Sequence, residues 1–450
     1  MPIEPVNGTE LTYYLLAYDK DGSERREGKD EFLSERLERD LSSGTVTDIF
    51  MFSHGWKGDV PAARDQYSRW VKVLADQKDD IASVKQIRPA FKPLLIGLHW
   101  PSLPWGDEEV GPASFGIAMP PTVGSPASGA AEDLLERLVE EYAERLADSP
   151  QARSALRTIF AAAATAIAPA TLPPEVVTAY ETLNREAGLR EGGEAAAPGH
   201  DREPFDAEGA YQRTRDEEAL AFGGFGLGGL LGPLRQLSFW KMKDRARVFG
   251  ETGGHRLLKR LQARTDIAVR FHLMGHSFGC IVASSLLSGP DGKGILPRPV
   301  DSLALVQGAL SLWSYCSAVP SSPDTPGYFR SIIDGRRVRG TFFTTQSESD
   351  TAVGQLYPWA AGIARQVNFP AGAQLPKYGA IGTFGVRGAG CEVVNRSMAD
   401  PQGANGFEAG KIYNLDGSVY ISGGTGISGS HSNIDRPEVA HAVWEAVLRS

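Results

Sequence analysis

Cysteine is scarce in this sequence of 450 residues, which contains only Cys280, Cys316 and Cys391. An odd, low count gives no disulfide framework, and no two of the three are spaced as in a CxxC zinc motif. Long apolar runs are also missing, so no stretch of about 18 residues predicts a membrane-spanning helix. We therefore expect a protein without structural disulfides, without a zinc site and without a transmembrane segment.

Positive charge is also limited. Lys and Arg number 46 against 55 for Asp and Glu, which gives a formal net charge of −9. That balance argues against a nucleic-acid surface and against electrostatic attachment to anionic lipid. The first residues, MPIEPVNGTEL, lack a basic stretch followed by an apolar one, so we see no signal peptide and expect a cytoplasmic location. Export by a signal-independent machine would leave no trace in the sequence.

Apolar strands alternate with helical segments in two parts of the chain. Near-continuous apolar runs such as VTDIFMF are typical of strands in a parallel sheet that is covered on both faces. Alternation of such strands with helices predicts an α/β fold with a mostly parallel central sheet and helices on both faces. The expected strands are 10–18, 47–53, 93–99, 267–274, 301–307 and 338–345, and the last expected helix is 437–448.

No convincing strand interrupts residues 102–235. We expect an α/β core formed by 1–101 and 236–450, with 102–235 inserted as a mainly helical cap or lid. The composition of REGGEAAAPGHDREP predicts a flexible tether near 187–209. The segment FGGFGLGGLLG, 222–232, is either a mobile apolar lid or a loop packed against the helices of the cap.

The stretch RFHLMGHSFGC ends an expected strand in Gly-His-Ser-Phe-Gly. A sharp strand-to-helix turn would force Ser277 into an unusual backbone conformation, and residues two positions away on each side must then be small. Gly275 and Gly279 meet that requirement. The hydroxyl would be exposed at the carboxyl edge of the sheet, beside the N-terminus of the next helix. Such a pentapeptide arises easily in a chain with 51 glycines, so its context decides the interpretation.

A serine hydroxyl is a poor nucleophile, which needs a base, and the base needs an orienting acid. His431, in the segment GSHS before the last helix, is the candidate base. Asp350, in RGTFFTTQSESD at the end of a late strand, is the candidate acid. The resulting order along the chain is Ser, Asp, His. The alternative carboxylates are Glu348, Asp324 and Asp334.

A tetrahedral oxyanion also needs hydrogen-bond donors. The segment FMFSHGWKG ends an early strand, and Gly55 would let the backbone pass close to a substrate. We expect the backbone N–H groups of Trp56 and Phe278 to form the oxyanion hole, and the Trp56 ring to contact the substrate. His54 is expected to pack below this loop and to hydrogen-bond the backbone.

Together these segments resemble the α/β-hydrolase superfamily, specifically serine esterases and lipases whose oxyanion loop is HG plus one residue. The resemblance rests on FMFSHGW, FHLMGHSFG, TTQSESDTAVG and GSHSNIDRPEV, and it covers 1–101 and 236–450. It implies that Ser277 is the nucleophile, His431 the base and acid, and Asp350 the orienting carboxylate, with no metal or organic cofactor. The loop has no HGGG run, so the subgroup that acts on esters of bulky alcohols is a poor match.

The expected function is a serine hydrolase that cleaves carboxylic esters through an acyl-enzyme. The apolar cap favours small-molecule or lipid esters with an uncharged acyl group. A serine peptidase, amidase or acyltransferase would use the same residues. A phospholipase-type effector would act on aggregated lipid, and a partner-binding scaffold would carry the triad without catalysis.

Overall fold

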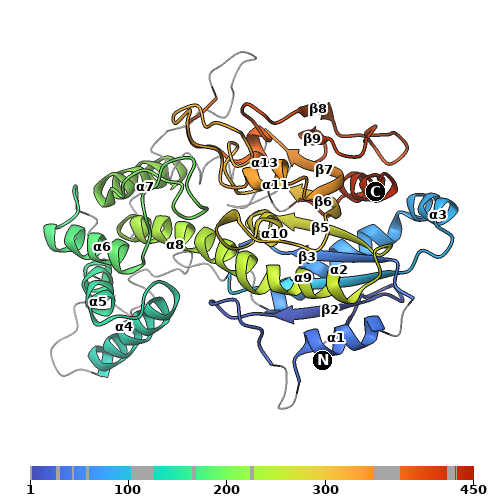
Figure 1. Cartoon of the computed structure of the whole chain (residues 1–450). Helices are drawn as coiled ribbons and strands as arrows, with labels where there is room; N and C mark the ends of the chain where they lie inside the picture. Colours follow the sequence, from blue (N-terminus) through green and yellow to red (C-terminus); the bar gives the residue numbers. More distant parts are fainter. Residues whose placement is uncertain are drawn as a thin grey trace.

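The structure is a computed structural model with a nine-stranded sheet at its centre and helices on both sides of the sheet (Figure 1). It describes residues 3–26, 31–42, 45–56, 60–102, 126–164, 169–222, 228–348, 375–422, 431 and 433–450. Within these ranges, the side chains of 126–131, 216–222 and 228–229 are not described.

The strands of the sheet follow the order β1-β2-β4-β3-β5-β6-β7-β9-β8. Every neighbouring pair is parallel except β1 and β2, which are antiparallel. The carboxyl ends of β3 and β5 therefore lie side by side at one edge of the sheet. The strands are β1 Ile3–Pro5, β2 Thr12–Ala17, β3 Asp48–Ser53, β4 Pro93–His99, β5 Arg270–His276, β6 Val300–Val306, β7 Val338–Gln346, β8 Val393–Ser397 and β9 Ile412–Asp416.

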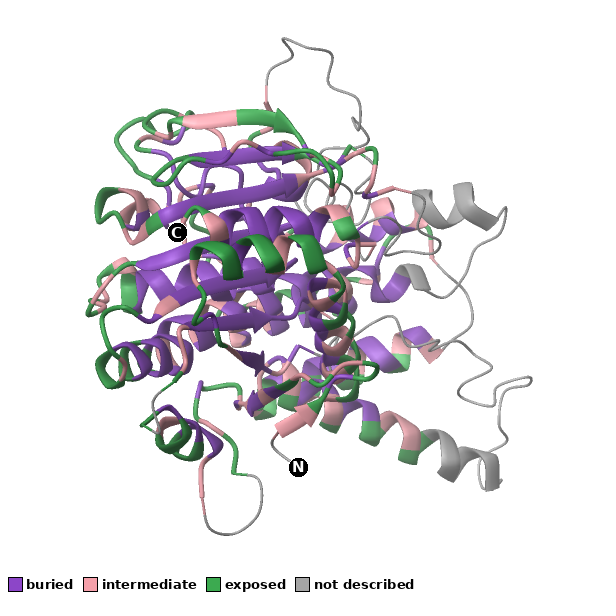
Figure 2. Cartoon of the chain, turned by 90° about the vertical axis from the view of Figure 1, so that its right-hand side faces the viewer, coloured by how far each residue is buried: buried purple, intermediate pink, exposed green. Residues whose placement is uncertain are grey.

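Two hydrophobic cores cover the two faces of the sheet. Along β3, Ile49 and Met51 enter one core while Phe50 and Phe52 enter the other, because successive side chains of a strand point to opposite faces. Figure 2 shows the buried central strands between helices whose outer faces are exposed. The first core is covered by α1 (Leu33–Ser42), α9 (His255–Arg264) and α10 (Gly279–Ser288), and the second by α2 (Val60–Asp76), α3 (Lys78–Ile87) and α14 (Pro437–Leu448). The short helices are Pro290–Gly292 (3-10), α11 (Arg330–Asp334) and α13 (Ile381–Phe384).

These observations confirm the predicted α/β class and the mostly parallel sheet. The final helix also begins and ends where the sequence predicts it. Strands β1, β8 and β9 were not predicted, and β9 lies between β7 and β8. Among the described residues, no helix is both long and apolar enough to cross a bilayer.

A group of helices connects β4 to β5 and lies to one side of the sheet (Figure 1). The described part of this connection contains no strand, as expected from the sequence. Its last helix leads back to the sheet and packs against α10. The helices are α4 (Pro126–Arg145), α5 (Pro150–Ala164), α6 (Pro174–Glu186), α7 (Ala207–Phe222) and α8 (Gly228–Phe249).

One π-helical turn, Gly250–Gly254, joins α8 to α9. A Cβ atom on Gly250 would lie 2.4 Å from the Ser285 Cβ, and one on Gly254 would lie 2.4 Å from the Leu286 Cδ1. Glycine is needed at Gly250, where a Cβ would also lie 2.9 Å from the Val282 carbonyl oxygen, because the helix backbone there passes close to α10.

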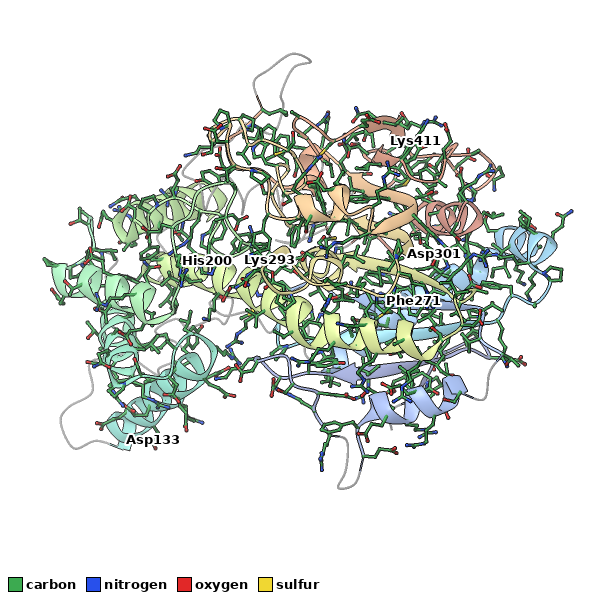
Figure 3. The ribbon with its side chains drawn as sticks, viewed as in Figure 1. Asp133, His200, Phe271, Lys293, Asp301 and Lys411 are labelled. Atoms are coloured by element: carbon green, nitrogen blue, oxygen red, sulfur yellow. The ribbon has the colours of Figure 1, made fainter. Side chains whose placement is uncertain are left out.

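Residues 188–206, within the segment predicted to be flexible, form a coil that packs against α8. The Lys243 ammonium on α8 binds the Asp201 carboxylate at 2.6 Å, and both side chains are buried. His200 lies beside α8 in Figure 3, and its Nε2 is 3.2 Å from the Asp244 carboxylate. Of the apolar segment 222–232, Leu230 and Leu231 are buried in the first core, and 223–227 lie outside the described residues.

Candidate active site

Ser277 occupies a sharp turn between β5 and α10. Its φ is 55°, in the left-handed region, which costs a residue other than glycine about 1–3 kcal/mol. The end of β6 and the residues after it hold this conformation: the Ser277 N–H donates to the Val306 carbonyl at 3.2 Å, and the Ser277 carbonyl accepts from the Ala309 N–H at 3.1 Å. Strain of this kind at the carboxyl edge of a sheet is typical of a nucleophilic serine.

The two flanking glycines are required by contacts with the backbone. A Cβ on Gly275 would lie 2.3 Å from the Gly279 carbonyl oxygen, and a Cβ on Gly279 would lie 2.1 Å from the Ser53 carbonyl oxygen. Neither position can accept a side chain unless the backbone moves. The Gly-x-Ser-x-Gly pattern therefore reflects crowding between β5, α10 and the end of β3.

Residues 54–56, which follow β3, pass directly against the serine. A Cβ on Gly55 would lie 2.7 Å from the Ser277 Cβ and 3.3 Å from its Oγ. Neither the Trp56 nor the Phe278 backbone N–H donates to another described residue. The half-buried Trp56 ring packs against Phe278 at 5.8 Å and against Phe239 of α8 at 6.0 Å. The structure thus places both predicted amides beside the serine, at one edge of the sheet.

A pair of buried imidazoles supports the 54–56 segment from below. The His54 Nδ1–H donates to the Gly55 carbonyl at 2.8 Å, so the His54 Nε2 must accept from the His99 Nδ1–H, 3.0 Å away. The His54 ring also stacks on Trp100. Burial lowers the pKa of His54 to about 4, and burial next to His54 lowers the pKa of His99 to about 2. Both rings are therefore neutral at neutral pH.

The backbone of His54 is fixed on both sides. Its N–H donates to the Tyr67 hydroxyl at 2.9 Å, and that hydroxyl donates to the Leu98 carbonyl at 2.5 Å. Its carbonyl accepts from the Trp100 indole N–H at 3.3 Å. The segment beside the serine is therefore tied to β4 and α2, and His54 has the packing role expected from the sequence.

His431 lies between β9 and α14 and is buried. Its carbonyl accepts a hydrogen bond of 3.0 Å from the His276 Nε2, and the two rings lie 4.8 Å apart. The structure therefore brings the predicted base to the residue next to Ser277. The Ser277 hydroxyl makes no hydrogen bond to the His431 ring or to any other described residue. Such bonds are often long or absent before substrate binds.

The second nitrogen of His276 faces α2. The Gln66 side-chain amide lies 3.1 Å from the His276 Nδ1, and Trp70 packs edge-on against the ring. Burial, with His431 close by, holds the pKa of His276 well below its ordinary value. His276 lies one position before Ser277 and is linked to His431, the predicted base; the sequence did not predict this link.

Asp350, the predicted orienting acid, lies outside the described residues. Among the alternatives, Asp334 forms an ion pair with Arg330 and precedes β7, at the amino end of the parallel strands and away from Ser277. Asp324 and Glu348 are exposed. None of these three forms a hydrogen bond or ion pair with His431 among the contacts of the described residues.

A hydrogen-bonded Ser-His-Asp chain lies deep in the sheet, away from Ser277. Ser302 Oγ is 2.9 Å from the His272 Nδ1, and the His272 Nε2 is 3.1 Å from the Asp48 carboxylate, to which Arg88 donates at 2.7 Å. Ser302, His272 and Asp48 are each at most 3% exposed. His272 and His276 thus bind different partners. Among the described residues, no cluster of three His, Cys, Asp or Glu is suited to bind a metal ion.

In comparisons with protein-family models, with curated proteins and with solved structures, no match to this chain was found.

Proposed function

We propose that this protein is a serine hydrolase of the α/β-hydrolase type that cleaves carboxylic esters through an acyl-enzyme. The observation that carries the proposal is the strained Ser277, held between β5 and α10 with the Gly55 backbone against it. In that fold the oxyanion donors come from the residue after the nucleophile and from the loop after the third strand. Phe278 and Trp56 occupy these two positions. The chain order Ser277, Asp350, His431 also fits.

In the proposed mechanism, Ser277 Oγ attacks the ester carbonyl while His431 takes its proton. The backbone N–H groups of Trp56 and Phe278 stabilise the resulting oxyanion, and each such donor is worth about 3 kcal/mol of the barrier. The alcohol leaves with the proton from His431, and water then repeats these steps on the acyl-enzyme. Asp350 would hold the His431 ring in the required tautomer.

The surroundings of the serine favour an apolar acyl group. Trp56, Phe278 and Phe239 form an aromatic cluster beside it, and Phe239 lies on the last helix of the group inserted between β4 and β5. Aromatic walls with a few polar groups at the reacting centre are typical of small-molecule sites. The helical group is proposed to act as the cap that selects substrates.

The test is the reaction with a fluorophosphonate probe, which labels only an activated serine quickly. We expect the wild-type protein to be labelled and to hydrolyse short p-nitrophenyl esters. Ser277→Ala should abolish both, and His431→Gln should slow both by at least about 10³-fold. A matched amide substrate and an acyl-chain series distinguish an esterase from an amidase and from a lipid-directed enzyme. A folded wild-type protein that neither reacts with the probe nor hydrolyses esters would refute the proposal.

A further inference from the structure

We propose that His276 is a positioning residue that holds the catalytic base in place, through the hydrogen-bonded chain Gln66–His276–His431. The inference rests on the proposed function, because it assigns a role toward the base of that same site. The chain connects α2, the residue before the nucleophile and the segment that carries His431.

The hydrogen bonds of His276 allow only one neutral tautomer. The His431 carbonyl oxygen can only accept, so the His276 Nε2 must carry the proton. The Nδ1 is then an acceptor, and the Gln66 side-chain NH₂ faces it as the donor. Gln66 therefore selects the tautomer that anchors the base, in the way that a carboxylate selects the tautomer of a catalytic histidine.

Position and burial suit His276 to this task. It ends β5, so its backbone is fixed by the sheet, and its side chain is buried between Trp70 and the His431 ring. Two residues that follow His431 also anchor this segment. Asn433 donates to the Ser422 carbonyl, and Asp435 forms an ion pair with Arg69. The hydrogen bond from His276 holds the backbone of the base residue itself.

The direction of the expected effect follows from this geometry. Loss of the His276 donor removes a bond that holds the backbone of the base. A shift of about 1 Å in a catalytic group costs on the order of 100-fold in rate. The binding of substrate depends on other groups, so kcat should fall while KM stays nearly constant. A side chain that restores a donor near the same place should restore the rate.

The experiment compares His276→Phe, which keeps a ring but removes the donor, with His276→Gln, whose amide nitrogen can replace the Nε2. His272→Phe is the matched control, because it also removes a buried imidazole from β5 but one bonded to Ser302 and Asp48. We measure kcat and KM for an ester, the rate of fluorophosphonate labelling, and thermal unfolding. All kinetics are recorded below the unfolding transition of each variant.

We expect His276→Phe to lower kcat and the labelling rate about 10- to 100-fold, and His276→Gln to recover most of the loss. His272→Phe should lower the unfolding temperature without a comparable loss of kcat. If His276→Phe does not fold, Gln66→Met, at a half-buried position of α2, removes the tautomer-selecting donor and should reduce kcat several-fold. An active wild type whose kcat is unchanged in these variants, or lost equally in His276→Phe and His276→Gln, overturns the inference. An inert wild type instead refutes the proposed function.

Discussion

Acid should destabilise this protein in part through His99, which lies beneath the segment beside the serine. His99 is 4% exposed, and its pKa is lowered to about 2 by burial and by the neighbouring His54. In the unfolded chain the same imidazole takes up a proton near its ordinary pKa of 6.5. Below that pH the unfolded state therefore binds more protons than the folded state, and stability falls as the pH falls.

The size of this effect follows from the two pKa values. Each pH unit below 6.5 shifts the balance by about 1.4 kcal/mol for one group. Between pH 6.5 and pH 4, His99 alone should therefore cost about 3 kcal/mol of the free energy of unfolding. Domains are typically stable by about 5–15 kcal/mol, so this loss is a substantial share.

The variant His99→Asn isolates this contribution. The Asn Nδ2 replaces the His99 Nδ1–H as donor to His54, so the bond below residues 54–56 can persist while the titrating group is removed. Urea unfolding followed by tryptophan fluorescence gives the free energy of unfolding at each pH. We expect the wild type to lose about 3 kcal/mol more than the variant between pH 6.5 and pH 4. Equal losses in the two proteins would show that His99 is protonated in the folded state.

Two further substitutions test the packing around the site and the helical group. Gly279→Ala places a Cβ 2.1 Å from a backbone carbonyl at the end of β3, which should lower the free energy of unfolding by about 1–3 kcal/mol or more. The control is Gly403→Ala, whose Cβ would have its nearest neighbour at 3.3 Å and which should leave the urea midpoint nearly unchanged. Lys243→Met leaves the Asp201 carboxylate buried without its ammonium partner and should cost about 3–5 kcal/mol, with faster trypsin cleavage within 188–206. Adding Asp201→Asn to Lys243→Met should recover part of that stability. If trypsin cuts 188–206 equally fast in the wild type, the single variant and the double variant, the packing of this coil against α8 is contradicted.

The central strands could be predicted because burial on both faces leaves a clear signal in the sequence. Strand β3 is buried at all six positions, and its residues alternate between the two cores. Strand β8 lacks this signal, since it lies at the edge of the sheet and its sequence VVNRS is half-buried or exposed. The insertion of β9 between β7 and β8 depends on pairing between strands distant in the chain, which periodicity does not encode.

The candidate site likewise has residues that could be predicted from the sequence and residues that could not. Ser277 and its glycines could be predicted because the constraint is local: a tight turn permits only small neighbours. Gln66 and His99 could not, because they reach the site from α2 and β4 and contact residues 210 and 45 positions away. The polar and small residues of 188–206 predicted flexibility, whereas the fold buries Asp201 against Lys243, and composition does not encode that distant contact.

We expect the buried Ser302–His272–Asp48 chain to be unreactive, although its hydrogen bonds connect the residue types of a catalytic triad. Its bonds of 2.9 and 3.1 Å follow the order of a triad. Yet Ser302 lies within β6 without the left-handed φ of Ser277, and the chain is enclosed between the sheet and its surrounding helices. Ser277 differs in its strained backbone and in the Gly55 segment beside its hydroxyl. We therefore expect Ser277→Ala, which keeps Ser302 and both of its partners, to show no fluorophosphonate labelling, while Ser302→Ala is labelled at the wild-type rate. Labelling that survives in Ser277→Ala and disappears only in Ser302→Ala would show that this reasoning from access and strain is wrong.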